Sequence, residues 1–229
     1  ISFYACAGEV TGIYGLMGAG RTELVRAIFG ADKFDSGQIL IENKQVEIKC
    51  CKRATQLGIA LLPEDRANQG LILSFSVKEN ISLANLDRIM NKLGISTKQE
   101  IKNAQKMVDM LKIKTPTLEQ PVLYLSGGNQ QKVVIAKWLN TDAKIIIFDE
   151  PTRGIDVGAK VEIYKIINDL KKQGKAVIMI SSELPECLGV SDRLYVMHEG
   201  EMCACFENLE GLTEDEVIKC ATGSDKNTK

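Results

Sequence analysis

GLMGAGRT, residues 15–22, organises the chain, because an apolar run typical of a strand precedes it and a run typical of a helix follows it. Gly15, Gly20 and Thr22 fit a template of a glycine, four residues, a second glycine, a lysine, and a serine or threonine. Arg21 stands where the template has the lysine. Glycines let the backbone wrap closely around a phosphate with its N–H groups turned inward, which a Cβ would obstruct. The stretch therefore predicts a phosphate-binding loop.

The residues around this loop would add a positive helix end and a hydroxyl group. A helix over residues 21–29 would present its N-terminal end, which carries partial positive charge, to the same anion. Gly18, Ala19 and Glu23 belong to the segment expected against the phosphates. Thr22 would supply a hydroxyl ligand for Mg²⁺. The alternative is an ordinary strand-to-helix turn without a ligand.

Composition narrows the class of protein. The 229 residues can bury one substantial core, as one large domain or as a core with an attached lobe. A formal net charge of −1 gives no basic field, so no nucleic-acid partner is expected. No apolar run approaches the ~20 residues of a membrane-spanning helix, and there is no signal peptide. Seven cysteines without a pair of CxxC units indicate reduced thiols and a cytosolic protein.

Short apolar runs alternate with helix-like runs toward both ends of the chain. The opening ISFYACAGEV, residues 1–10, already lies inside a strand pattern and has no initiating methionine, which suggests a chain cut from a longer polypeptide; a processed or trimmed chain would look the same. Two short strands are expected on either side of Asn43 and Lys44. Further strand-like runs lie at 59–62, 144–148, 176–180, 193–197 and 201–205. The alternation predicts an α/β fold with a mainly parallel sheet, covered on both faces, and a small antiparallel β region.

The middle of the chain changes to helical periodicity. Helix-like runs begin near Val77, Lys98 and Ser126. We therefore expect residues 1–65 and 141–229 to form the core, and residues 66–140 to form an α-helical lobe inserted into it. The polar tail after Thr222 is expected to be disordered.

Two acidic residues follow one of the strands that are expected to be buried. Ile145 to Phe148 is continuously apolar and is followed by Asp149 and Glu150. The end of a parallel strand beside a phosphate loop is where nucleotide phosphates lie, so Asp149 is expected to hold Mg²⁺. Glu150 would then stand beside an attacking water as a general base or water-orienting group. Taken alone, the two acids would be an ordinary solvated strand end.

A second anion-binding device is expected at LSGGNQQK, residues 125–132. Ser126, Gly127 and Gly128 open a helix there, which offers exposed backbone N–H groups, a hydroxyl and the positive end of a helix dipole. The alternative is an ordinary serine N-cap after a loop broken by prolines.

Together these stretches resemble the nucleotide-binding cassette of the ABC ATPases, and the match covers essentially the whole chain in order. GLMGAGRT is similar to the Walker A motif, LSGGNQQK to the signature, IIIFDEPT to the Walker B motif, and Gly154-Ile155-Asp156 to the D-loop. Longer sequence stretches, such as PEDRANQGL and DEPTRGIDVGAK, resemble the second cassette of tandem ATPases that drive ribose, galactose and related sugar importers. The resemblance implies the RecA-like fold of P-loop NTPases.

The resemblance also implies ATP and Mg²⁺ as ligands and two kinds of partner. Two cassettes, here expected in the same polypeptide, would close head to tail over two ATPs. Each ATP would lie between the Walker A of one cassette and the signature of the other. The ATP site of the partner cassette would then be completed by five residues of this chain: Ser126, Gly127, Gly128, Gln130 and Asp156. Closure would act on transmembrane permease subunits, so the cassette is expected peripherally at the cytoplasmic face of the membrane.

Three positions depart from the family pattern near the γ-phosphate. Arg21 replaces the Walker A lysine with a longer, planar fork. Glu64 replaces the Q-loop glutamine, although a carboxylate would still ligate Mg²⁺. Ser182 replaces the switch histidine, and a hydroxyl is too short to carry that charge. We hypothesise that the chain's own site binds ATP and hydrolyses it slowly or not at all, although Asp149 and Glu150 are retained.

Some alternatives stay open at this level. A nucleoside importer could use the same tandem architecture, and a regulatory module could bind nucleotide without turnover. The segment 66–76 is expected to contact the membrane subunits, with Asp65 and Arg66 as candidate residues. Phe3 and Tyr4 are candidates for stacking on adenine.

Overall fold

The computed structural model describes residues 1–91 and 94–224. Contacts divide the chain into two compact units. The first comprises Ile1–Leu61, Lys144–Pro151 and Ile167–Lys229, and the second comprises Leu62–Ala143 and Thr152–Ile166. The end of the polar tail, residues 225–229, lies outside the described residues.

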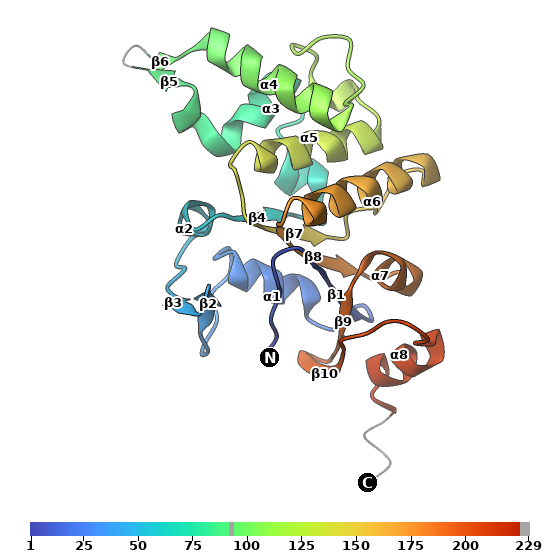
Figure 1. The fold of residues 1–229 in the computed structure, drawn as a ribbon. Helices are drawn as coiled ribbons and strands as arrows, with labels where there is room; N and C mark the ends of the chain where they lie inside the picture. Colours follow the sequence, from blue (N-terminus) through green and yellow to red (C-terminus); the bar gives the residue numbers. More distant parts are fainter. Residues whose placement is uncertain (92–93, 225–229) are drawn as a thin grey trace. The chain divides into compact units, whose positions relative to one another are not determined.

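The first unit is built on a six-stranded sheet in the order β10-β9-β1-β8-β7-β4 (Figure 1). Its strands are β1 (Val10–Gly15), β4 (Ile59–Leu62), β7 (Ile145–Asp149), β8 (Ala176–Ser181), β9 (Arg193–His198) and β10 (Glu201–Phe206). β1 pairs in parallel with β8 and β9, β7 pairs in parallel with β8, and β10 runs antiparallel to β9. The mainly parallel sheet expected from the apolar runs is confirmed.

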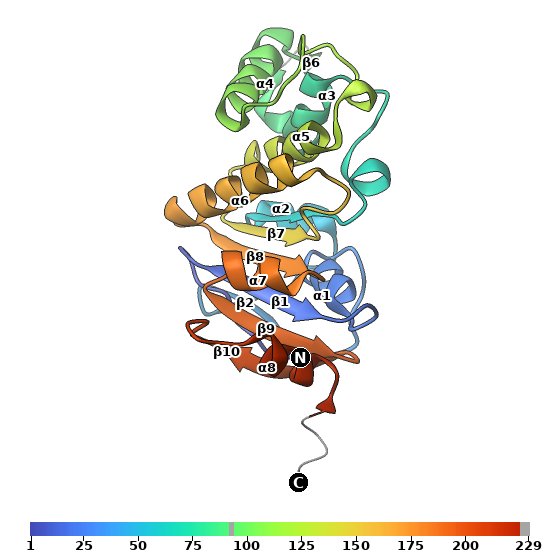
Figure 2. The same ribbon diagram turned by 90° about the vertical axis from the view of Figure 1, so that its right-hand side faces the viewer.

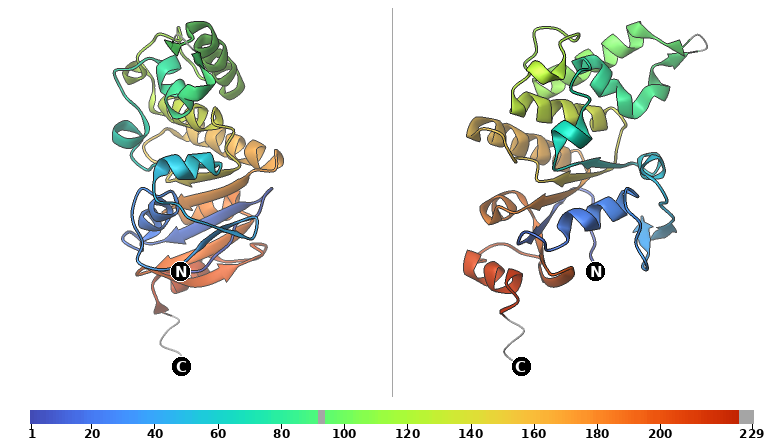
Figure 3. Two further views of the ribbon diagram at one scale, coloured as in Figure 1. Left: turned by 90° about the vertical axis from the view of Figure 1, so that its left-hand side faces the viewer. Right: turned by 180° about the vertical axis from the view of Figure 1, so that it is seen from behind.

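Helices cover both faces of this sheet. The helix α1 (Arg21–Ile28) lies on one face, and α7 (Leu184–Val190) and α8 (Glu214–Ala221) lie on the other (Figures 1 and 3). A buried cluster joins the sheet to α7 and α8 through Tyr14, Leu184, Cys187, Leu194, Val196, Val217 and Ala221. The unit also holds the helix α2 (Cys51–Gln56) and the antiparallel pair β2 (Ile39–Ile41) and β3 (Lys44–Val46).

The second unit is mainly helical. It contains η1 (Arg66–Gly70), α3 (Val77–Ser82), η2 (Leu83–Arg88), α4 (Thr97–Leu111), η3 (Val122–Tyr124), α5 (Gly127–Leu139) and the first residues of α6 (Val157–Lys172). The strand β5 (Met90–Asn91) pairs antiparallel with β6 (Gly94–Ile95). Figure 2 shows α3, α4 and α5 packed side by side. α3 begins with a reciprocal capping box, in which the side chains of Ser76 and Glu79 each accept from the other's backbone N–H.

The strand register places the candidate site. Tyr14 of β1 is level with Ser181 of β8, and Asp149 of β7 is level with Ile180 of β8. Because these three strands are parallel, the segments that follow them leave the sheet at the same edge. The glycine loop, Glu150 and Ser182 all belong to those segments.

Gly15, the last residue of β1, is required by close packing. A Cβ at this position would lie 2.6 Å from the carbonyl oxygen of Met197 and 2.9 Å from Ala19 Cβ. We expect Gly15→Ala to lower the free energy of unfolding by about 1–3 kcal/mol, because the Met197 carbonyl belongs to the backbone of β9 and the Ala19 Cβ is fixed to its own backbone, so neither can move aside as the end of a flexible side chain can.

The matched control is Gly189→Ala in α7, where a Cβ meets no atom within 4 Å. It should raise the free energy of unfolding by about 0.5–1 kcal/mol, since alanine favours a helix over glycine. Urea denaturation of the two variants measures both effects. Equal stability of Gly15→Ala and the unmodified chain would contradict the packing argument.

Candidate functional site

The glycine loop connects β1 to α1 with an outward-facing turn. Leu16, Met17 and Gly18 are exposed, whereas Ala19 is buried. The backbone of Ala19 is held from both sides, because its N–H donates to the Leu16 carbonyl (3.0 Å) and its carbonyl accepts from Gly200 N–H (3.0 Å). Gly18 and Gly20 adopt φ values of 80° and 91°, a region that favours glycine.

Gly20 is the N-cap of α1 and offers no side chain to its first N–H groups. The start of α1 therefore keeps its partial positive charge and its N–H donors for an anion. Glu23, also expected near the phosphates, is exposed in the first turn.

Thr22 and Asp149 meet beside this helix start. The Thr22 hydroxyl donates to Asp149 Oδ1 over 3.2 Å, and Asp149 is only 2% exposed. Burial raises the pKa of Asp149 from 3.8 to about 6, and the hydrogen bond from Thr22 opposes that shift. A hydroxyl and a carboxylate are oxygen ligands that Mg²⁺ prefers, and a cation there would offset the cost of burying the charge. The pair therefore fits the magnesium site that the sequence predicts.

Glu150 is contacted by both Arg21 and Ser182. Arg21 Nη1 lies 3.3 Å from Glu150 Oε1, and both side chains are about one-tenth exposed (10% and 11%). Among the described residues Arg21 Nη1 has no hydrogen-bond partner, so this contact is an ion pair without hydrogen-bond alignment. The Ser182 hydroxyl donates to Glu150 Oε2 over 3.2 Å. Both carboxylate oxygens of Glu150 are thus engaged by the chain itself.

The backbone of Glu150 is also unusual. Its φ is 48°, in the left-handed region that side chains rarely adopt, and its N–H donates to the Ile180 carbonyl over 3.0 Å. Such a conformation costs on the order of 1–2 kcal/mol, and residues of this kind gather at functional sites. The strain supports a functional role for this turn.

The predicted signature residues lie in the second unit. Ser126 is the N-cap of α5, and its hydroxyl accepts from Asn129 Nδ2 (2.9 Å) instead of capping a backbone N–H of the helix. Gln130 Nε2 donates to the Val122 carbonyl (3.0 Å). Asp156 Oδ1 accepts from the N–H of Ala159 (3.0 Å), at the start of α6. A Cβ on Gly128 would lie 2.6 Å from the Ala159 Cβ, so the beginnings of α5 and α6 pack closely.

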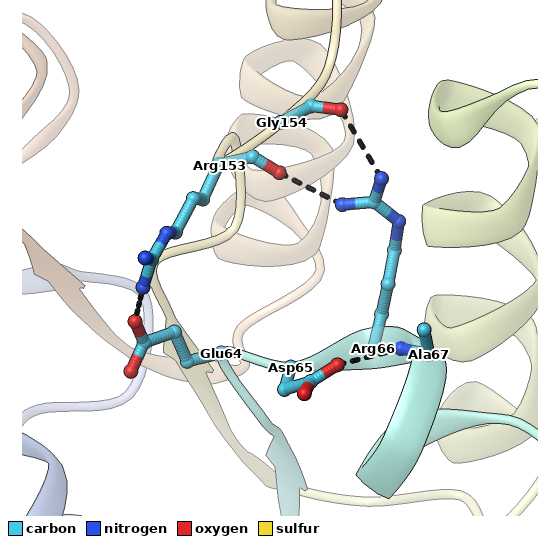
Figure 4. A pocket seen from close by; sticks show the side chains of 6 residues that line it. All are labelled: Glu64, Asp65, Arg66, Ala67, Arg153 and Gly154. Atoms are coloured by element: carbon cyan, nitrogen blue, oxygen red, sulfur yellow. Dashed lines mark hydrogen bonds and ion pairs between the residues drawn. The ribbon is translucent and has the colours of Figure 1, made fainter.

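Glu64, expected as a magnesium ligand, forms an ion pair with Arg153 in the second unit (Figure 4). These residues line a pocket of about 520 Å³ together with Asp65, Arg66, Ala67 and Gly154. The sequence offers no local signal for the ion pair, because Glu64 and Arg153 are far apart along the chain.

Phe3 and Tyr4 both pack away from the glycine loop. Phe3 makes an edge contact with Tyr195, at 5.7 Å between ring centroids, and the Tyr4 ring lies 4.2 Å from the Arg193 guanidinium. Arg193 is level with Thr11, near the beginning of β1, whereas the glycine loop follows the end of that strand.

A family model described as "ABC transporter" matches residues 1–153. The Ribose import ATP-binding protein RbsA of Oceanobacillus iheyensis is 52% identical over 223 residues, which cover 97% of this chain and 45% of that protein. The Xylose import ATP-binding protein XylG of Thermoanaerobacter pseudethanolicus is 54% identical over 97% of this chain and 44% of that protein. The chain thus spans about half the length of the curated relatives it matches.

Solved structures share the fold. A nucleotide-free ATP-binding cassette from an ABC transporter superposes with a TM-score of 0.82 at 27% identity, covering 96% of this chain and 90% of that one. An ATP-binding cassette in its ADP conformation gives a TM-score of 0.78 at 26% identity, covering 97% and 91%. Among the described residues no helix has the length and apolar character that crossing a membrane requires.

Burial of Asp149 predicts how stability depends on pH. The folded state holds the Asp149 proton more tightly than the unfolded state, because burial raises the pKa of the folded carboxyl from 3.8 to about 6. Its contribution to stability is therefore full below about pH 4 and is lost as the pH rises through about 6. In Asp149→Asn this dependence is absent. Relative to the unmodified chain, the variant should gain about 3 kcal/mol between pH 4 and pH 8.

Urea denaturation without metal, repeated across this pH range, measures the difference. The exposed residue Asp87 supplies a control, since Asp87→Asn removes one negative charge at an unburied position. Stability curves of Asp149→Asn and the unmodified chain that stay parallel with pH would contradict the assignment.

Proposed function

We propose the following function for this chain, which belongs to the ABC transporter family. The chain is the ATP-binding cassette of a sugar importer, and it couples the binding and hydrolysis of Mg-ATP to solute import. The observation that carries this proposal is the meeting of a glycine loop, a helix start and the Thr22–Asp149 pair at one edge of the sheet. Those groups supply N–H donors for phosphates and oxygen ligands for Mg²⁺.

Each site residue has a definite part in this proposal. The N–H groups of residues 15–22 and the start of α1 bind the phosphates of ATP. Thr22 and Asp149 hold Mg²⁺, which neutralises phosphate charge, and Glu64 is the further candidate ligand. Glu150 orients the attacking water. Each role asks for the type of group that the chain has at that position.

The second unit would serve another cassette. Ser126 and the first N–H groups of α5 carry no backbone cap from the serine side chain, which leaves them for an anion outside the chain. We propose that these groups, with Gly127, Gly128, Gln130 and Asp156, complete an ATP site on a second cassette. Since curated relatives are about twice as long as this chain, that cassette is proposed to lie in the same polypeptide.

The names of the relatives support a sugar as the solute. They are ribose and xylose import proteins, with putative ribose, galactose and methyl galactoside importers also among them. Transmembrane permease subunits are the proposed partners, and the cassette is proposed to attach to them at the cytoplasmic face of the membrane. A nucleoside importer of the same architecture stays a second proposal, because other subunits select the solute.

The ion pair of Arg21 favours slow turnover at the chain's own site. Arg21 has to leave Glu150 before it can contact a γ-phosphate, and Glu150 has to exchange Arg21 and Ser182 for a water. Groups that act on the γ-phosphate stabilise mainly the transition state, so their loss lowers the rate more than the affinity. A cassette that binds ATP without hydrolysing it is the limiting case of this proposal. The retention of Glu150, a residue able to orient the attacking water, favours some hydrolysis.

The test is Mg-ATP binding and steady-state hydrolysis by the unmodified chain and by Arg21→Lys/Ser182→His. The unmodified chain should bind Mg-ATP and turn over slowly. The double variant restores a compact ammonium and an imidazole that reaches farther than a hydroxyl, so its rate should rise about tenfold or more at similar affinity.

Arg53→Gln in α2 provides a control, since it changes an exposed cation outside the site. Absence of ATP binding would contradict the proposed function itself. Fast turnover by the unmodified chain, with no gain in the double variant, would contradict only the slow site.

A further inference from the structure

Arg66 reaches from η1 to the backbone that precedes the D-loop aspartate. Its Nη1 donates to the Arg153 carbonyl over 2.8 Å and its Nη2 donates to the Gly154 carbonyl over 3.1 Å (Figure 4). These two carbonyls lie just before Ile155 and Asp156. A single planar guanidinium therefore fixes two consecutive peptide groups.

The turn that carries Arg66 is itself fixed. Asp65 caps η1 by accepting from the N–H groups of Ala67 and Asn68, each at 3.1 Å, and from Asn68 Nδ2 at 2.7 Å. Hydrogen bonds from Asn68 hold the pKa of the Asp65 carboxyl below its ordinary value. The carboxylate stays ionised at neutral pH and keeps this turn in place.

η1 is also held against α5. Lys137 donates to the Gly70 carbonyl over 2.5 Å, and a Cβ on Gly70 would lie 3.1 Å from Val134. At the other end of α5, a Cβ on Gly127 would lie 2.8 Å from Arg66 Nη2 and 3.1 Å from the Gly154 carbonyl oxygen. The guanidinium therefore occupies space that only a glycine at position 127 leaves open.

We propose that Arg66 is a positioning residue, which holds the D-loop backbone against the start of the signature helix. The inference rests on the proposed function, in which Ser126–Gly128 and Asp156 together complete the ATP site of a second cassette. Arg66 touches the backbone on both sides of that half-site, at 153–154 and at Gly127, and so sets the spacing between them. This spacing decides whether both groups can meet the same nucleotide.

An arginine is needed for geometric reasons. Its fork donates two N–H groups to two acceptors in one plane, whereas a lysine ammonium is a point charge on a flexible stem. Asp65 and Arg66 were the residues expected to face membrane subunits. The contacts of both lie within the second unit, which favours the internal role.

The test uses the full-length protein with its membrane subunits and compares Arg66→Gln and Arg66→Lys with the unmodified protein. Arg66→Gln should lower kcat about tenfold or more, because a displaced D-loop misaligns the composite site. The affinity of this chain's own phosphate loop for a fluorescent ATP analogue should change less than about twofold, because that loop is untouched. Arg66→Lys should recover part of the lost kcat, because its ammonium can reach one carbonyl.

Arg153→Gln is the matched control. It removes the ion pair to Glu64 but leaves the backbone carbonyls that accept from Arg66, so kcat should fall less than in Arg66→Gln. An unchanged kcat in Arg66→Gln, or an equal loss in Arg66→Gln and Arg153→Gln, would overturn the proposal. Full activity of Arg66→Lys would overturn the requirement for the two-pronged fork.

Hydrogen exchange tests the role of Arg66 without any nucleotide. Amides of residues 154–160 should exchange faster in Arg66→Gln and at the unmodified rate in Arg153→Gln, since only the first variant frees the D-loop backbone. Unchanged exchange in both would overturn the clamp. Failure of the proposed function would appear separately, as absence of ATP binding in the unmodified protein while the exchange difference persists.

Discussion

The parallel pairing of β1, β8 and β7 is the constraint on which the rest of the structure depends. It sets Tyr14 level with Ser181, and Asp149 level with Ile180, so three chain segments leave the sheet at one edge. Arg21, Glu150 and Ser182 meet there although they are widely separated in the sequence. The glycine loop needs this sheet as much as its own glycines, because Gly15 packs against Met197 of β9 and the Ala19 carbonyl accepts from Gly200, which follows β9.

The site at this edge is less stable than an apolar strand end would be. Asp149 is buried at the cost of a raised pKa, and Glu150 adopts a left-handed backbone conformation. Both features are expected where a fold keeps polar groups for a ligand at some expense of stability. In the structure these groups contact one another, since Thr22 donates to Asp149, Ser182 donates to Glu150, and Arg21 forms an ion pair with Glu150. In the proposed function, binding of Mg-ATP would replace these internal contacts.

Sequence patterns predicted most of the sheet and the inserted helices, because continuous apolar runs such as 145–148 and periodic runs such as 98–111 need no long-range information. They missed α2 and α7, which are short, and α8, although Thr213 and Glu216 form a capping box that the sequence displays. The motifs named candidate site residues but not their contacts. Neither the Arg21–Glu150 pair nor the hydrogen bonds of Arg66 could be predicted, since both join residues that only the tertiary fold brings together.

The central claim is that Arg21 holds Glu150 in the resting site, and that a γ-phosphate has to displace this contact. The most direct measurement is the affinity of Glu150→Gln, relative to the unmodified chain, for a non-hydrolysable ATP analogue and for ADP. If the claim holds, removal of the carboxylate charge frees Arg21, and the ATP analogue binds about fivefold or more tightly while ADP binding changes little. Equal affinities in both proteins, or an equal gain for ADP, would contradict it.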